Sequence, residues 1–166
     1  NRRQFTIGAV DKYTWVDIGS SYLPSDMLAA YLYAQLEVRD DIQSKRKKIW
    51  AFYNDNLVGW AMQHDVRLPI IPDDCEQSYH MFYMLFPSLK KRQGFISYLR
   101  EAKIHSVFHY LPLHLSKMGK QFGGIEGGCP ITEEISDRLV RLPFYNDLTS
   151  AEQNYIVETI QQYQGV

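Results

Sequence analysis

Residues 13–37, YTWVDIGSSYLPSDMLAAYLYAQLE, join a polar turn that contains a glycine directly to a helix. Ser25 is a good N-cap, Asp26 adds a negative charge to the first turn, and Pro24 restricts the backbone that leads in. Beyond this start, residues recur at helical spacing: Leu28, Tyr31, Leu32, Gln35 and Leu36. The stretch therefore predicts a capped helix that follows a hydroxyl-rich turn.

The turn before this helix is the first candidate binding site. Free backbone N–H groups at a helix start can bind an anion, and Ser20, Ser21 and Tyr22 add hydroxyl donors beside them. A capped core helix explains the same residues without any ligand and is the commoner case. These residues alone leave both interpretations open.

The middle of the chain alternates helices with short strands. We expect a helix from Asp26 to about Trp60, broken near residues 37–41, and aromatic-rich strands at 79–86 and 106–110. Between the two strands, Ser88 is expected to cap a helix that reaches about Lys103. This order predicts a domain in which strands and helices share one core.

The last third of the chain is less regular at first. Residues 115–130 contain five glycines and predict a mobile, irregular loop, after which Thr132 is expected to cap a short helix. Thr149-Ser150-Ala151-Glu152 is a capping box that opens the final helix. An apolar stripe follows on that helix: Tyr155, Ile156, Ile160 and Tyr163.

These elements indicate a small α/β domain of the α+β kind, with about three strands packed against helices. Two of the strands are visible in the sequence, and we expect at least one more in the irregular parts. Residues 1–24 read as an extended, polar and aromatic arm. Residues 25–166 then form the domain itself, including the long helix that links it to the arm.

Composition excludes several classes of partner. The formal charge of −1 gives no general attraction to nucleic acid or to a membrane surface, and the basic run 45–48 is expected to be a solvated helix face. No segment has the length of a transmembrane helix. Cys75 and Cys129 are expected to be reduced thiols, which suits a cytoplasmic protein.

The second candidate site is the segment His109-Tyr110-Leu111-Pro112-Leu113-His114. A strand end followed by proline presents side chains at a sheet edge, where ligands commonly bind. The imidazoles of His109 and His114 and the phenol of Tyr110 can hydrogen-bond sugar hydroxyls or diphosphate oxygens. The alternative is that Tyr110 and one histidine are packed and the other histidine is solvated.

A zinc site is the other use of these histidines. His105, His109 and His114, together with Cys129, include a His-x-x-x-His spacing that suits zinc on a helix. Val107 and its aromatic neighbours favour a strand instead, in which positions four apart lie about 13 Å from each other. We therefore expect no metal site here.

Four ordered segments also resemble a known family: residues 13–37, Pro72–Tyr83, His109–His114 and Arg141–Thr149. They are similar to segments of the sugar-nucleotide aminotransferases, which are pyridoxal-phosphate enzymes of the aspartate-aminotransferase fold (fold type I). The resemblance covers essentially the whole chain and is strongest to the branch that forms dTDP-4-amino-4,6-dideoxygalactose. It implies that the domain is the C-terminal small domain of such an enzyme.

The resemblance also implies that the catalytic lysine lies outside this chain. In the family, the lysine that forms the Schiff base with pyridoxal 5'-phosphate precedes the region that the chain matches. None of the nine lysines here has a context that would desolvate it or place it beside another charge. We therefore expect no catalytic residue in the chain, and no covalent cofactor and no activity from the chain alone.

Several binding residues follow from the resemblance. Family members generally have Gly-x-Asn-x-Arg at residues 19–23, where this chain has Ser21 in place of the asparagine and Leu23 in place of the arginine. Ser21, with Ser20, is expected to contact the cofactor phosphate of the neighbouring subunit, whereas Leu23 cannot bind a phosphate. Arg2 resembles an arginine that pairs with a sugar-nucleotide phosphate, although a frayed terminus explains it equally well. His109, Tyr110 and His114 are expected to bind substrate.

The function implied for the intact enzyme is transfer of an amino group from glutamate to C4 of a nucleotide-linked 4-keto-6-deoxyhexose. Such sugars enter cell-surface polysaccharide or lipopolysaccharide. We expect a homodimer, with exchange of the N-terminal arm between subunits as one possible arrangement. The alternatives are a stand-alone module that binds a nucleotide sugar, and a dimerisation or regulatory module without catalysis.

Overall fold

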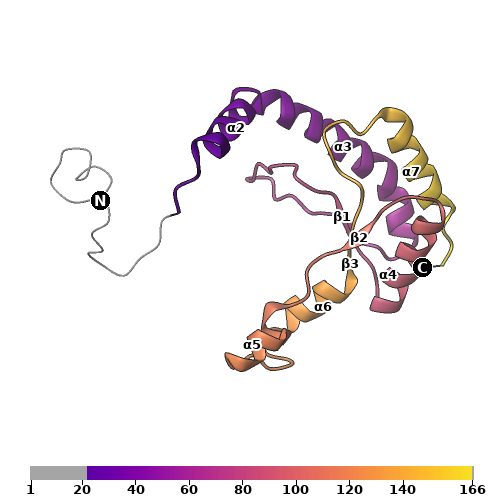
Figure 1. Cartoon of the computed structure of the whole chain (residues 1–166). Helices are drawn as coiled ribbons and strands as arrows, with labels where there is room; N and C mark the ends of the chain where they lie inside the picture. Colours follow the sequence, from indigo (N-terminus) through magenta and orange to yellow (C-terminus); the bar gives the residue numbers. More distant parts are fainter. Residues whose placement is uncertain (1–21, 166) are drawn as a thin grey trace. The chain divides into compact units, whose positions relative to one another are not determined.

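The structure, a computed structural model, describes residues 22–165 (Figure 1). Arg2, Ser20 and Ser21 lie outside the described residues, as does most of the predicted arm. The chain divides into two compact units, with the boundary between Glu37 and Val38. The division of the chain at residues 24 and 25 stays a prediction.

The first unit contains the helix that the opening stretch predicts. Helix α2 spans Asp26–Glu37, and the Ser25 hydroxyl accepts a hydrogen bond from the Leu28 N–H at 3.3 Å. Asp26 lies in the first turn, as expected. None of the helix residues is buried within the structure.

The second unit begins with the long helix α3, Arg39–Gln63. The break between α2 and α3 falls at Val38, within the range predicted for it. Helix α3 turns one face toward the core, formed by Ile49, Trp50, Tyr53, Leu57, Trp60 and Ala61. Their spacing of three to four residues is that of a single buried helix face.

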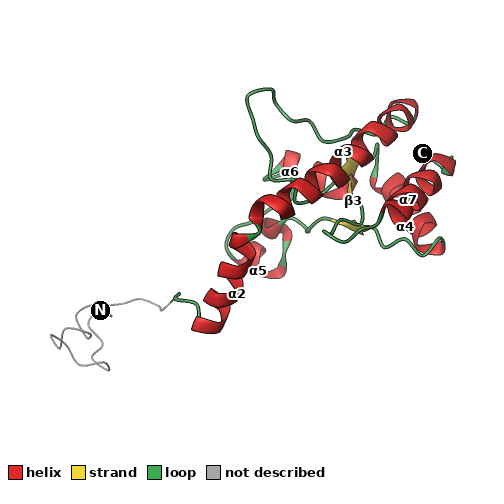
Figure 2. Cartoon of the chain, turned by 90° about the horizontal axis from the view of Figure 1, so that it is seen from above, coloured by secondary structure: helices red, strands yellow, loops and turns green. Residues whose placement is uncertain are grey.

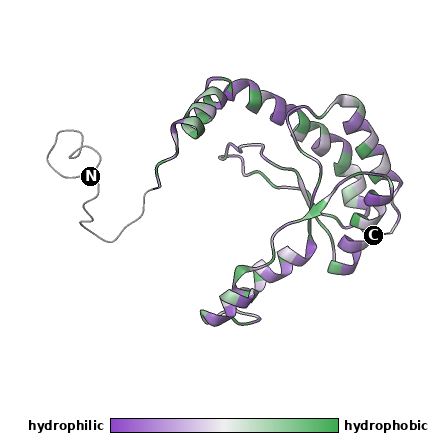
Figure 3. Ribbon diagram, in the orientation of Figure 1, coloured by the Kyte–Doolittle hydropathy of each residue, from purple (hydrophilic) through white to green (hydrophobic). Residues whose placement is uncertain are grey.

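The sheet has three short antiparallel strands in the order β1-β3-β2. Strand β1 is Tyr83–Leu85, β2 is Val107–Phe108 and β3 is Leu139–Arg141. The third strand confirms the expectation of one hidden in the irregular part of the sequence. Figure 3 shows hydrophobic colour where the strands meet, and Met84 and Val140 are completely buried.

Strand β1 and its flanks show why this part of the chain is extended. Phe82, Met84 and Phe86 are completely buried, whereas the residues between them are only partly buried. This alternation with a period of two is that of a strand with one face on the core. The Phe82 ring packs on α3, with its centroid 5.6 Å from the ring of Trp50 and 5.3 Å from that of Tyr53.

Two further helices complete the core. Helix α4 is Leu89–Glu101, and the Ser88 hydroxyl caps it by accepting from the Lys91 N–H. Helix α7 is Ser150–Gln162 and opens with the predicted capping box. Figures 1 and 2 show α4 and α7 on one side of the sheet, while α6 leads away from the strands toward α5.

The glycine-rich region departs from its prediction. Instead of an irregular loop throughout, it contains the 3-10 helix η1, Leu113–Leu115, and the helix α5, Lys117–Gln121, which Ser116 caps. Two of the glycines allow this packing. A Cβ on Gly119 or Gly124 would collide with backbone carbonyl oxygens of η1.

The next helix begins earlier than predicted. Helix α6 is Pro130–Arg138, so Thr132 lies inside it and is not its cap. Pro130 occupies the first turn, where the fixed φ of proline suits a helix start. The Glu133 carboxylate then accepts a hydrogen bond from the N–H of the N-cap residue, Cys129, at 3.2 Å.

Two smaller corrections concern the lengths of the strands and the exposure of Tyr155. The strands are shorter than expected, so that His109 and Tyr110 follow β2 and do not lie in it. The reason is pairing, because β2 has only two partners in the three-residue strand β3. Tyr155 is half exposed, since its hydroxyl extends away from the core to the Ala102 carbonyl at 3.0 Å.

Candidate substrate-binding site

His109 and Tyr110 form the centre of the candidate site, directly after β2. Their rings meet edge to face with centroids 5.1 Å apart. The Tyr110 side chain points into solvent, with 77 % of its surface exposed. His109 is half-buried, and its Nδ1 atom is buried without a hydrogen-bond partner.

Arg141 joins this pair from the neighbouring strand β3. Its guanidinium carbon lies 5.8 Å from the centroid of the Tyr110 ring, within the range of a cation–π contact. The antiparallel register sets Arg141 opposite Val107, two residues before His109. Its Nη2 donates to the Phe108 carbonyl at 3.5 Å, and its Nε is buried and unpaired.

Sequence reasoning did not select Arg141 as a binding residue, although it begins one of the four segments that carry the family resemblance. A signal was present, because a charged residue stands between apolar residues in Leu139-Val140-Arg141-Leu142. Only the strand pairing shows that this charge lies beside Tyr110.

The environment of His109 keeps its ring neutral. Burial lowers the pKa of His109, and the positive charge of Arg141 and the nearby His80 lower it further. A neutral imidazole can both donate and accept hydrogen bonds. His109 is therefore suited to bind hydroxyl groups.

A buried polar chain supports Tyr110 from behind the sheet. Arg92 is 8 % exposed, and its Nη1 donates to the Ser136 carbonyl at 3.0 Å. The Ser136 hydroxyl donates in turn to the Tyr110 carbonyl, also at 3.0 Å. The Arg92 guanidinium also lies 5.5 Å from the ring centroid of Phe108. Helices α4 and α6 thus hold the backbone that presents Tyr110.

The structure ties His114 to a different group. Its Nε2 lies 2.8 Å from the Glu133 carboxylate, which also accepts from the N–H of Gly127 at 3.0 Å and from that of Cys129. The hydrogen bond from His114, followed by the one from Gly127, lowers the pKa of Glu133. The structure thus brings His109 and Tyr110 together and anchors His114 to the first turn of α6.

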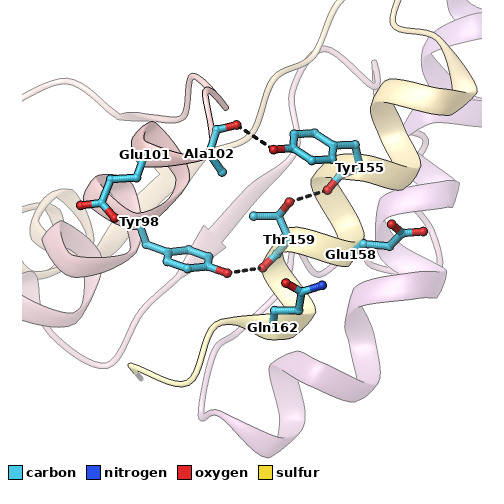
Figure 4. Close-up of a pocket in the computed structure, with 7 residues that line it drawn as sticks. All are labelled: Tyr98, Glu101, Ala102, Tyr155, Glu158, Thr159 and Gln162. Atoms are coloured by element: carbon cyan, nitrogen blue, oxygen red, sulfur yellow. Dashed lines mark hydrogen bonds between the residues drawn. The ribbon is translucent and has the colours of Figure 1, made fainter.

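A cavity of about 240 Å³ lies between α4 and α7, apart from these residues (Figure 4). It is lined by Tyr98, Glu101, Ala102, Tyr155, Glu158, Thr159 and Gln162. The two tyrosine hydroxyls donate to backbone carbonyls, Tyr98 to Thr159 at 3.2 Å and Tyr155 to Ala102. These two hydroxyls are therefore already paired, and the remaining polar side chains of the lining are those of Glu101, Glu158, Thr159 and Gln162.

Two other kinds of feature, a metal site and a membrane-spanning helix, can be judged for residues 22–165. No group of three or more His, Cys, Asp and Glu side chains in this range could hold a metal ion. None of the helices in the same range is both long and apolar enough to cross a membrane.

Comparison with known proteins decides the family. Residues 3–161 match the DegT/DnrJ/EryC1/StrS aminotransferase family. The chain belongs to this family of aminotransferases. The family prediction made from the four segments is thereby confirmed.

A curated relative and two solved structures show the extent of the likeness. The dTDP-3-amino-3,6-dideoxy-alpha-D-galactopyranose transaminase of Aneurinibacillus thermoaerophilus is 27% identical over 157 residues, which are 94% of this chain and 41% of that protein. A family aminotransferase from Brucella abortus matches 91% of this chain and 39% of its own, with 27% identity and a TM-score of 0.76. The PLP form of the putative sugar aminotransferase Spr1654 from Streptococcus pneumoniae matches 82% and 35%, with 26% identity and a TM-score of 0.73.

The chain therefore spans about two fifths of the length of the curated relative. The predicted fold class is confirmed, since the small sheet and its helices match parts of solved aminotransferases. The family also includes a structure with pyridoxal phosphate, so this cofactor is supported for the family.

The described lysines do not fit covalent attachment of that cofactor. Seven of them are exposed: Lys45, Lys47, Lys48, Lys90, Lys103, Lys117 and Lys120. Lys91 is only half-buried. A lysine that attaches pyridoxal phosphate must be desolvated or beside another cation, so that its amine is free near neutral pH. None of these eight lysines therefore fits as the residue that attaches the cofactor.

Proposed function

We propose that this chain is the C-terminal, small-domain part of a pyridoxal-phosphate-dependent sugar-nucleotide aminotransferase, and that it supplies contacts to the sugar nucleotide. The family match over residues 3–161 carries this proposal. The cluster of His109, Tyr110 and Arg141 supports it, because it combines a neutral imidazole, an exposed phenol and a guanidinium at one sheet edge. Such groups suit a ligand that carries both hydroxyls and phosphates.

The reaction proposed for the intact protein moves an amino group from glutamate to C4 of a nucleotide-linked 4-keto-6-deoxyhexose. Glutamate leaves as 2-oxoglutarate, and the ketone of the sugar becomes an amine. The choice of C4 rests on the resemblance to the branch that forms dTDP-4-amino-4,6-dideoxygalactose. The name of the relative from Aneurinibacillus thermoaerophilus describes a 3-amino sugar, so the position of the amine is part of the test.

The cofactor, when bound, supplies an electron sink for the exchange of the amino group. We propose that Ser20 and Ser21 bind its phosphate and that Arg2 pairs with a phosphate of the sugar nucleotide. The lysine is proposed to lie in the part of the relatives that this chain does not match. Residues from two subunits would then complete each site, which is why we also propose a homodimer.

The residues of this chain have binding roles in the proposal. His109 in its neutral form and Tyr110 hydrogen-bond hydroxyls of the sugar. His114 is proposed to contact the substrate from the anchored position that Glu133 provides. The buried chain from Arg92 through Ser136 keeps Tyr110 in place.

The first experiment identifies the polypeptide that the native cell makes and then assays it. An antibody against this chain isolates the protein, and intact mass shows whether it exceeds 19.4 kDa. The isolated protein is incubated with pyridoxal phosphate, glutamate and dTDP-4-keto-6-deoxyglucose. We expect release of 2-oxoglutarate and a new amino sugar, whose amine NMR places at C4 or C3.

The opposite result is equally clear. A native species of 19.4 kDa that releases no 2-oxoglutarate would overturn the enzyme proposal. Retained binding of the sugar nucleotide would then favour the stand-alone binding module. If the protein neither releases 2-oxoglutarate nor binds the sugar nucleotide, the dimerisation or regulatory module is favoured.

A further inference from the structure

Arg141 is a half-buried cation that lacks a negatively charged neighbour within the described residues. The ion pairs found there join Arg39 to Asp40, Lys45 to Asp41, His114 to Glu133 and Arg138 to Glu134. Arg141 takes part in none of them, and its one hydrogen bond, to the Phe108 carbonyl, is long at 3.5 Å. A partly buried charge is costly unless it is paired.

The groups around Arg141 make this charge more unusual. The charged groups that act on the adjacent His109 are Arg141 and His80, and both are basic side chains. The Ser78 hydroxyl lies 2.9 Å from Nδ1 of His80. The site therefore gathers one fixed cation and two imidazoles without a carboxylate among them.

The geometry leaves the guanidinium available to a ligand. One face of the group lies toward the ring of Tyr110, which is itself exposed, so the site opens to solvent. Nη1 of Arg141 has no hydrogen-bond partner in the described structure, and Nη2 has only the long contact to Phe108. A guanidinium edge with free donors binds an oxyanion through two parallel hydrogen bonds.

We infer that Arg141 binds the diphosphate group of the sugar nucleotide, with the Tyr110 ring holding the guanidinium in place. This inference rests on the proposed function and adds to it a residue that sets the substrate class. Glutamate could offer a carboxylate to the same donors. The diphosphate suits the site better, because it carries more negative charge than a carboxylate and offers more oxygens to the forked donors of Arg141.

Binding to the chain itself tests this inference without any catalysis. Titration calorimetry measures the affinity for thymidine diphosphate, inorganic pyrophosphate, thymidine and glutamate. We expect the first two to bind and thymidine and glutamate to bind much more weakly. Arg141→Gln should weaken pyrophosphate binding about 10- to 100-fold, the value expected for hydrogen bonds to a charged group.

Matched variants separate this role from a structural one. Arg100→Gln removes an exposed arginine from the last turn of α4 and should leave pyrophosphate binding unchanged. Tyr110→Leu removes the ring beside the guanidinium and should bind pyrophosphate less tightly than the wild type. Pyrophosphate should also shift the NMR signals of the neighbouring His109 ring. If Arg141 had only a structural role, adding pyrophosphate would leave these signals unchanged.

If the amide NMR spectrum shows that Arg141→Gln does not fold, Arg141→Lys replaces it in the binding experiment. The lysine keeps the charge but loses the forked donors, so weaker pyrophosphate binding is again expected. Equal pyrophosphate affinity in folded Arg141 variants and the wild type would overturn the inference. So would a wild-type chain that binds no diphosphate, or one in which Arg141→Gln weakens only glutamate binding.

The outcome of the transamination assay is independent of these binding measurements. If pyrophosphate binding depends on Arg141 but the native protein releases no 2-oxoglutarate, the proposed enzyme function fails and the anion site stands. If 2-oxoglutarate is released but Arg141→Gln binds pyrophosphate normally, the enzyme function stands and the role of Arg141 is wrong.

Discussion

Nε2 of His114 lies 2.8 Å from Oε1 of Glu133, and this contact joins η1 to the first turn of α6 across 19 residues. The Glu133 carboxylate is a shared acceptor, since it also receives the N–H groups of Gly127 and Cys129. One side chain thus fixes the loop between α5 and α6, the start of α6 and the last histidine of the candidate site.

Glu133→Gln should make the protein less stable, with an effect that depends on pH. The contacts of Glu133 lower its pKa below 4.5, so the folded state favours the ionised carboxylate. The resulting stability is present above that pH and is lost as the pH falls through the lowered pKa. Thermal unfolding should show a difference between wild type and variant near neutral pH that shrinks in acid. A difference that stays constant across this range would contradict the role of the charge.

Gly119→Ala and Gly124→Ala should disrupt the segment that carries His114. A methyl group at either position meets backbone carbonyl oxygens of Leu113 and His114, which cannot move aside as a flexible side chain can. We expect a cost of about 1–3 kcal/mol, as for overpacking elsewhere. Hydrogen exchange of the amides in α5 and the start of α6 should become faster.

Gly59→Ala is the matched control for these substitutions. Gly59 lies inside α3, and a Cβ there meets no atom within 4 Å. Alanine in a helix interior is favoured over glycine by roughly 0.5–1 kcal/mol, so this variant should be more stable than the wild type. If all three substitutions destabilise the protein equally, close backbone packing is not the reason for Gly119 and Gly124.

Thr149→Ala should lower the free energy of unfolding by about 1 kcal/mol, the usual value for loss of an N-cap. The Thr149 hydroxyl accepts from the Glu152 N–H at 3.3 Å, and the Glu152 carboxylate accepts from the Thr149 N–H at 2.8 Å. Urea unfolding measures the change. Ser150→Ala, at the exposed next position, should have little effect, and an equal loss there would contradict the capping role.

Arg141→Gln should raise the pKa of His109. Burial lowers this pKa first, and the charge of Arg141 lowers it further, so removal of that charge should bring the pKa part of the way back toward 6.5. An NMR titration of the imidazole carbon protons measures the shift directly. Arg100→Gln is the control and should leave the His109 titration unchanged. An unchanged pKa in Arg141→Gln would mean that the two side chains do not interact.

The same shift has a consequence for stability. Because the folded state disfavours the protonated His109 ring, the unfolded state binds the proton more readily. His109 therefore opposes folding increasingly as the pH falls below 6.5, and not above it. His109→Asn should remove this pH-dependent cost, so that variant and wild type differ in slope between neutral and mildly acid pH.

Local patterns in the sequence predicted the helices well, because their signals lie within a few residues of one another. Ser25, Ser88 and the box at Thr149 each satisfy N–H groups of their own first turn, and the break near Val38 was visible in the same way. The start of α6 was missed for a related reason. Its N-terminus depends on Pro130 and on the Glu133 carboxylate, which accepts from the Cys129 N–H. The sequence also contains Thr132, a common type of N-cap residue, and the prediction chose that residue instead.

The family could also be predicted from the sequence, because the order of motifs along the chain can be recognised without knowing how they are arranged in space. His109 and Tyr110 were predicted together because they are neighbours along the chain. Their binding roles stay predictions, as do those of Ser20 and Ser21, which lie outside the described residues.

Only the tertiary structure brought Arg141 to Tyr110 and His114 to Glu133, across 31 and 19 residues of sequence. The first relationship depends on the strand order β1-β3-β2, which places the late strand β3 between two earlier ones. Strand pairing of this kind depends on burial of residues such as Met84 of β1 and Val140 of β3 in one core, to which residues throughout the chain contribute. Helix starts are determined by neighbouring residues, whereas the charges around a site are determined by which strands pair.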